Sequence, residues 1–279
     1  MPRMDSHAEL TFDAVDDLVG AYSRGRLEQP RPSHRFVPGA IGPLIELAYH
    51  AQGGKFAGLS TSPWLDPVAQ ADLRSTLLGT TVCWFDHSHH RGFLRTVVNP
   101  LDVRDDPVRT GFLLAGRKAA EAVGFPVPIA QSLSAAIREM ESNIHEHSQR
   151  PRTGVLAYQA NGGGFEFVIA DEGIGVLASL RQAPEFKNLS DHGRALHAAL
   201  QEGVSRHGRA ANRGTGFKDL FLGLTSLNAN LRFRSGDHAL IIRGPSPNLK
   251  TAQLVQKPFY QGFLISVQCD LPAPSRARH

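Results

Sequence analysis

Hydrophobic residues recur at steps of three and four along residues 128–147, as in a helix that buries one face. This stripe consists of Leu133, Ala136, Ile137, Met140 and Ile144. Beside it, Glu139, Asn143 and His147 are spaced four residues apart. Because steps of four keep side chains on one face, with a drift of roughly 40° per step, the pattern predicts a polar row of carboxylate, carboxamide and imidazole along this helix.

The first ninety residues have the pattern of a mixed α/β region. Apolar spacing predicts helices at residues 10–22 and 40–51, and the β-branched and aromatic residues of 79–85 predict a strand. No motif with a recognisable chemistry occurs here, so we assign residues 1–90 to an N-terminal α/β region without a predicted role.

From residue 91 the pattern becomes sharper. Asp106 followed by Pro107 predicts a helix start, because the acid caps free amides and proline fits the first turn, and Gly124 predicts the end of that helix. Strands are predicted at residues 92–100, 153–160 and 165–170, the last two joined by an Asn-Gly-Gly-Gly hairpin turn at 161–164.

Residues 177–272 contain segments with weak and with strong signals of secondary structure. Residues 177–212 contain one helical patch at 195–201 and otherwise little predicted order, and an amphipathic helix is predicted at 217–227. Strands are predicted at 230–235, 238–243 and 262–272, the first two joined by a two-residue hairpin at Gly236 and Asp237.

Composition and charge exclude several classes of protein. The chain has 279 residues, of which 41% are hydrophobic and 20% charged, and no apolar run approaches the ~18 residues of a membrane span. Two cysteines and a polar N-terminus without a signal-peptide pattern predict a cytoplasmic protein. The net charge of +4 is compatible with an anionic ligand. His87, His89 and His90 lack partner ligands at familiar spacing, so a solvated loop is favoured over a metal site.

Two glycine motifs follow the polar helix. Asp-x-Gly-x-Gly at 171–175 ends a predicted buried strand, and Gly-x-Gly at 214–216 precedes the predicted helix at 217–227. Each motif alone also fits an ordinary turn. They become informative because they follow, in this order, a Glu-x-x-x-Asn-x-x-x-His helix and a hairpin.

With this order of motifs, residues 91–272 resemble the ATP-binding domain of the GHKL superfamily, which includes gyrase B subunits, the heat-shock chaperone, sensor histidine kinases and mismatch-repair ATPases. The lead-in and residues 195–217 most resemble bacterial anti-sigma-factor serine kinases. The resemblance implies an α+β fold: a two-layer sandwich of Bergerat type, whose mixed, mainly antiparallel sheet is covered on one face by helices. Residues 273–279 form a basic tail.

The resemblance assigns Mg-ATP chemistry to the polar helix. It implies that Asn143 is the Mg²⁺ ligand, since Mg²⁺ prefers oxygen ligands, and that Glu139 is the general base beside the γ-phosphate. His147 at the helix end is implied to shape the site, and a packing or capping role is an equal alternative.

The glycine motifs would hold the two ends of the nucleotide. The resemblance implies that Asp171 accepts the exocyclic amine of adenine, which the carbonyl of guanine cannot replace. Gly173 and Gly175 would let the chain turn beneath the base, and residues 177–212 would form the ATP lid. The expected phosphate-binding residues are Arg213, Gly214, Thr215, Gly216 and Lys218, of which the two cations also fit a solvated surface.

The sequence differs from the GHKL pattern in two places, and these differences reduce the number of functional classes that fit. Gly262 is followed by Phe263 where the family usually has threonine, and no phospho-acceptor helix precedes the domain, which disfavours a complete sensor histidine kinase. We therefore expect a cytosolic signalling kinase or ATPase acting with a protein partner. The alternatives are a nucleotide-sensing module with little turnover and, less favoured, a nucleic-acid-binding protein. The sequence leaves a homodimer open.

Overall fold

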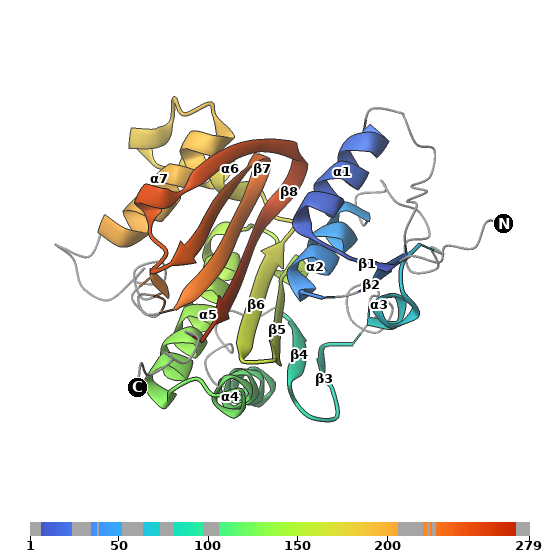
Figure 1. Cartoon of the computed structure of the whole chain (residues 1–279). Coiled ribbons are helices and arrows are strands. Elements are labelled where there is room, and N and C mark those ends of the chain that lie inside the picture. The colour runs from blue at the N-terminus through green and yellow to red at the C-terminus, as the bar shows by residue number, and fades with distance from the viewer. Residues whose placement is uncertain are drawn as a thin grey trace, which may run out of the picture.

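The centre of the molecule is a six-stranded sheet (Figure 1). The computed structural model describes residues 7–23, 35–37, 39–51, 64–72, 81–96, 106–205, 220–221, 224 and 227–271. In spatial order the strands are β3 (Cys83–Phe85), β4 (Arg91–Arg95), β5 (Val155–Asn161), β6 (Gly164–Asp171), β8 (Gln253–Asp270) and β7 (Asn228–Pro245). Every pairing in this sheet is antiparallel, so the expectation of a mixed sheet is wrong. The parallel strands β1 (His7–Glu9) and β2 (Arg35–Val37) pair separately.

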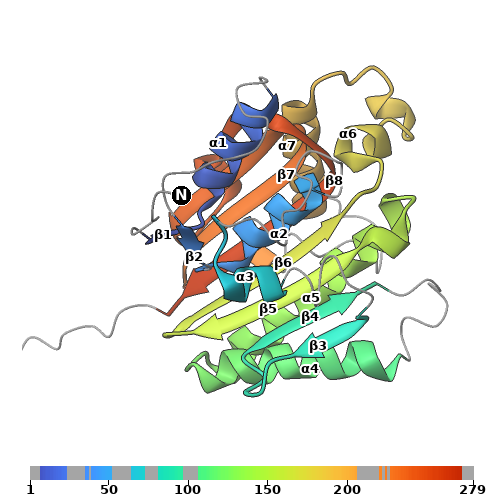
Figure 2. The same cartoon turned by 90° about the vertical axis from the view of Figure 1, so that its right-hand side faces the viewer.

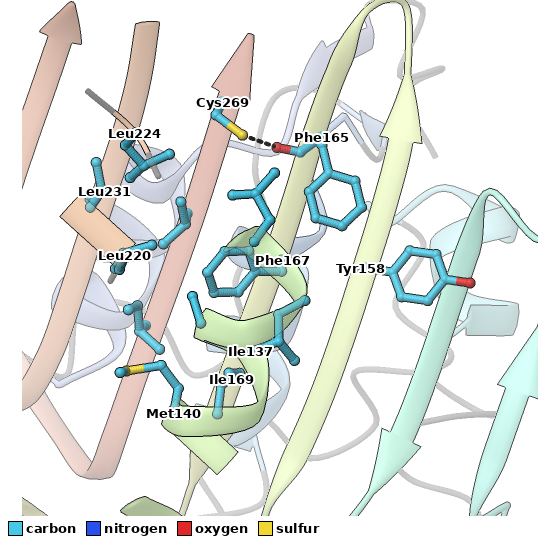
Figure 3. Packing of buried hydrophobic residues seen from close by; sticks show 14 of the residues in the cluster. Ile137, Met140, Tyr158, Phe165, Phe167, Ile169, Leu220, Leu224, Leu231 and Cys269 are labelled. Carbon is cyan, nitrogen blue, oxygen red and sulfur yellow. Dashed lines mark hydrogen bonds between the residues drawn. The ribbon is translucent and has the colours of Figure 1, made fainter. Parts of the chain in front are cut away.

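Helices cover one face of this sheet, which confirms an α+β sandwich. They are α4 (Pro107–Ala122), α5 (Val127–His147), α6 (Gly175–Leu180) and α7 (His192–Ser205). Phe165, Phe167 and Ile169 alternate along β6 toward this face, where Ile137 and Met140 of α5 pack against them (Figure 3). The apolar stripe predicted for residues 128–147 is therefore the buried face of α5.

The helix caps and the turn predicted from short sequence signals are present in the structure. The side chain of Asp106 accepts a hydrogen bond from the amide of Val108 at 2.9 Å, and Pro107 is the first residue of α4. Gly124 follows this helix with φ +103°. Gly162 and Gly163, both with positive φ, form the predicted turn between β5 and β6. These predictions are confirmed.

The N-terminal helices cover the other face of the same sheet. The predicted helices at 10–22 and 40–51 are present as α1 (Phe12–Ser23) and α2 (Ile41–His50), and a short α3 spans Pro67–Asp72. Their apolar residues form a second core with Val168, Ala170 and Leu264. In Figure 2, α1 and α2 lie on the side of the sheet opposite α5. The N-terminal segment thus adds a third layer to the expected two.

A buried ionic network joins this third layer to the sheet. Glu46 on α2 is fully buried, and its carboxylate accepts hydrogen bonds from Arg232 at 2.8 and 2.9 Å and from Arg234 at 2.9 Å. Arg232 also contacts Asp16 on α1 at 2.8 Å, and Lys257 contacts the same carboxylate at 2.6 Å. Burial opposes the ionisation of Glu46, but the two guanidinium groups outweigh it and lower its pKa to about 2.

The predicted hairpin at Gly236 and Asp237 is wrong. Residues 228–245 form one long strand, β7, which pairs with β8 on both sides of Gly236. The register shifts between Arg234 and His238, where Gly236 has φ +60°. Each two-residue step along β7 here corresponds to four residues of β8, so the pairing shows an irregularity within two continuous strands rather than a hairpin.

The expectation of little order after residue 177 is also wrong in part. Residues 175–180 form α6, and α7 runs from His192 to Ser205, longer than the predicted patch at 195–201. Leu177, Leu196 and Leu200 are buried in the core on the α5 side. The helix predicted at 217–227 falls largely outside the described residues, but Leu224 donates a helical hydrogen bond to Leu220 at 3.1 Å. Short 3₁₀ turns occur at Pro151–Thr153, Pro184–Phe186 and Leu249–Thr251.

The ionic network generates a stability prediction. Glu46→Gln leaves the buried guanidinium of Arg234 without its carboxylate partner and leaves Arg232 with Asp16 alone. We therefore expect the free energy of unfolding to fall by about 3–5 kcal/mol in urea titrations at pH 7. The matched control is Glu121→Gln, which removes the half-exposed pair with Arg117 on α4 and should change stability by less than about 1 kcal/mol. Equal losses in the two variants would contradict this account.

Candidate functional site

The C-terminal end of α5 and the glycine turn after β6 lie against each other. The carbonyl of Ser148, the residue after α5, accepts a hydrogen bond from the amide of Ile174 at 2.9 Å. By strand alternation, Asp171 faces the same side of β6 as Phe167 and Ile169, which is the side that α5 covers. The polar helix and the Asp-x-Gly-x-Gly motif are therefore neighbours, although they are separate in the sequence.

Four hydrogen bonds hold the turn in place from surrounding elements. The amide of Glu172 donates to Thr153 Oγ1 at 2.9 Å, and that of Val176 to Ser235 Oγ at 2.9 Å. Gln261 Nε2 donates to the carbonyl of Gly173 at 2.5 Å. With the bond from Ile174, the turn is attached to α5, to the start of β5, to β7 and to β8. It is a rigid scaffold rather than a loose connection.

Glycine is required sterically in this turn. A Cβ atom on Gly173 would overlap the carbonyl oxygen of Ser148, and one on Gly262 would overlap the carbonyl oxygen of Asp171. Gly262 and Gly175 also have φ values of +87° and +77°, which favour glycine. The backbone of β8 therefore approaches the end of β6 directly at this point.

Asp171 is a buried carboxyl group, with 3% of its surface exposed. Burial raises its pKa to about 7, although hydrogen bonds from the amides of Gly173 and Phe263 lower it. Since this pKa lies above the ordinary value of 3.8, the stability it contributes is present below about pH 4 and is lost as the pH rises through 7. Ionisation of Asp171 therefore destabilises the folded protein, although the ionised carboxylate is the stronger hydrogen-bond acceptor for an amine.

The polar row on α5 is graded from half-buried to exposed. Glu139 and Asn143 are half-buried, and the carboxamide of Asn143 lies 3.8 Å from Met140 Sδ, a weak contact. His147 at the helix end has a side chain 58% exposed, and its Nε2 is 4.0 Å from Glu146. The predicted row is present on α5, and its last member, His147, is directed to solvent.

The second glycine turn falls outside the described residues. These include all five candidate phosphate ligands: Arg213, Gly214, Thr215, Gly216 and Lys218. Their roles stay predictions. Leu220 and Leu224, which follow them, are buried in the same core as Ile169 and Met140.

Nothing in the sequence pattern singles out the residues that hold the first turn. Each of these contacts is a hydrogen bond to a backbone group far away in the sequence. They involve the carbonyl of Ser148 and the side chains of Thr153, Ser235 and Gln261. Serine and threonine beside predicted turns are a weak signal, because most of them bond locally. These contacts depend on the tertiary fold.

A cavity of about 240 Å³ lies elsewhere, at the opposite end of β6. It is lined by Glu9, Gly39, Ala40, Gln159, Asn161, Gly164, Phe165, Glu166 and Gln268. Glu166 already accepts bonds from the first amides of α2, Ile41 at 2.7 Å and Gly42 at 2.9 Å. The cavity shares no residue with the Asp171 turn, and we consider the chemistry of the turn the better guide to function.

Comparisons with protein-family models, curated proteins and solved structures found no match. Within the described ranges, no cluster of three or more histidine, cysteine, aspartate or glutamate residues is arranged to hold a metal ion. Nor does any described helix combine the length and the apolar character needed to cross a bilayer.

The side chains near this turn can be compared with those that a magnesium nucleotide requires. Asp171 has a carboxylate that can accept a hydrogen bond from an exocyclic amine, and it lies beside a turn that contains two glycines. Asn143 offers a neutral oxygen suitable for Mg²⁺, and Glu139 a carboxylate one turn away. These residues fit the group by their chemistry and by their common face of the sheet.

The glycine turn yields a direct test of its packing. Gly173→Ala forces a methyl group into the Ser148 carbonyl and should lower the free energy of unfolding by about 2 kcal/mol or more. Gly111→Ala on α4 is the control, because a Cβ there meets nothing within 4 Å and should stabilise the helix by about 0.5–1 kcal/mol. Thermal or urea unfolding of both variants measures the difference, and a neutral Gly173→Ala would refute the close approach.

Proposed function

We propose that the chain binds Mg-ATP between α5 and the Asp171–Gly175 turn. The observation that carries this proposal is the contact of Ser148 with Ile174, which joins the polar helix to the glycine turn on one face of the sheet. Two motifs of a nucleotide site that are distant in sequence are thereby adjacent. The sequence resemblance to GHKL domains supports the same assignment.

Each residue has a role that follows from its chemistry. Asp171 accepts the adenine amine, Asn143 binds Mg²⁺, and Glu139 orients or deprotonates the nucleophile that attacks the γ-phosphate. Because Asp171 is only 3% exposed, side chains around the turn move aside when the base enters. We propose a signalling kinase or ATPase that acts with a protein partner, by resemblance to the anti-sigma-factor kinases.

A second candidate is a nucleotide-sensing module with little turnover. It is favoured by the packing of α2 directly behind the end of β6, where Tyr49 lies within 3.2 Å of the carbonyl oxygen of Ala170. In such a module the N-terminal helices would respond to the bound nucleotide. Binding is common to both candidates, and turnover separates them.

Nucleotide binding is tested by thermal stability at pH 8, above the raised pKa of Asp171. Mg-ATP at ~100 times its dissociation constant should add roughly 2.7 kcal/mol of stability, while Mg-GTP should add none. Asp171→Asn should abolish the ATP effect. Asp270→Asn, at the opposite end of the neighbouring strand, is the matched control and should keep it. Equal shifts with ATP and GTP would argue against adenine recognition.

Turnover is tested with Glu139→Gln. If Glu139 is the base, this variant keeps the ATP-induced stabilisation but loses at least ~100-fold in phosphate release or transfer to a protein acceptor. Glu146→Gln, on the exposed side of the same helix, should retain the wild-type rate. A wild-type protein that binds ATP without measurable turnover would favour the sensing module.

A further inference from the structure

Helix α2 reaches the candidate site from the back of the sheet. The hydroxyl of Tyr49, in the last turn of α2, lies 2.6 Å from the carbonyl oxygen of Thr153 and 3.2 Å from that of Ala170. Ala170 immediately precedes Asp171. Thr153 in turn accepts the amide of Glu172 through its Oγ1 at 2.9 Å. The Tyr49 hydroxyl therefore connects the end of β6, at Ala170, with Thr153. Asp171 lies between Ala170 and Glu172, and the amide of Glu172 is bound by Thr153.

The Tyr49 hydroxyl is suited to remain a donor. Its side chain is buried, and burial, followed by the nearby carboxylates of Asp171 and Glu172, raises its pKa well above the ordinary value. It stays protonated throughout the physiological range.

The position of α2 is fixed by the ionic network. Glu46, three residues before Tyr49, binds Arg232 and Arg234 on β7. Arg234 is followed by Ser235, whose hydroxyl donates to the carbonyl of Gly262 at 2.8 Å and accepts the amide of Val176. Both ends of the glycine turn are thus connected to α2, one through Tyr49 and the other through β7.

We propose that Tyr49 is a positioning residue for adenine recognition. By holding the carbonyls of Ala170 and Thr153 together, it sets the position of the Asp171 carboxylate for the exocyclic amine of the base. The inference rests on the proposed function, since it concerns the same site. It places part of the specificity of that site in the N-terminal helices, outside the segment that carries the nucleotide motifs.

The chain contains a matched control for Tyr49. Tyr260 on β8 is also buried, and its ring centroid lies 6.1 Å from that of Tyr49. Its hydroxyl has no hydrogen-bond partner among the described residues. Replacing either tyrosine by phenylalanine removes one buried hydroxyl, but only the change at position 49 disconnects the turn.

The experiment compares ATP with inosine triphosphate, which carries a carbonyl in place of the amine. Dissociation constants of the full chain are measured by calorimetry with Mg²⁺ at pH 8. Wild type and Tyr260→Phe should prefer ATP to the same extent. Tyr49→Phe should lower this preference roughly fivefold, the effect of one lost hydrogen bond, with the affinity for inosine triphosphate within about twofold of wild type.

The outcomes separate the inference from the proposed function. If the wild type binds neither nucleotide, the proposed function fails. If it prefers ATP and Tyr49→Phe keeps that preference, or weakens both nucleotides equally as a merely structural residue would, the positioning role is overturned. Thr153→Val, at a half-buried site, provides a second variant should Tyr49→Phe not fold. It keeps the carbonyl that Tyr49 contacts but removes the acceptor of the Glu172 amide, and it should lower the ATP preference likewise. An unchanged preference would refute the premise that the Thr153 segment positions the Asp171 carboxylate.

Discussion

The ion pairs between Glu46 and two arginines determine how the layers of this protein fit together. Arg232 and Arg234 are two residues apart on β7, so both point to the α2 side, while Phe233 between them enters the core on the α5 side. A slip of one residue in β7 would bury both cations in the apolar core. Such charges are costly to bury and tolerate few arrangements, so they specify the register of the strand and the position of the helix.

From this constraint the geometry around the glycine turn follows. Fixing α2 places Tyr49 against the end of β6, and fixing β7 places Ser235 between Gly262 and Val176. The turn is therefore supported from both faces of the sheet. Its own sequence supplies only the glycines that make close approach possible and the carboxyl group that faces α5.

Local signals in the sequence predicted the local parts of this structure. The apolar stripe at 128–147, the cap at Asp106 and the glycine turn after β5 each act within a few residues, and each is present. The signal at Gly236 and Asp237 was ambiguous, because a glycine with positive φ can occur in a hairpin turn or within a continuous strand, and only the pairing with β8 distinguishes the two. The third layer depends on contacts such as Glu46 with Arg232, 186 residues apart, which no periodicity reveals. The motif residues of the candidate site were visible for the same local reason, and their supporting residues were not.

Two of the buried carboxyl groups, Glu46 on α2 and Asp171 at the end of β6, have opposite electrostatic surroundings. Glu46 is surrounded by cations that lower its pKa to about 2, so its charge is compensated within the fold. Burial raises the pKa of Asp171 to about 7, and among the described residues no cation lowers it. A neutral residue would serve the stability of the fold better at this position. Under the proposed function, the cost of ionising this carboxyl group is offset when the exocyclic amine of the bound base donates to it.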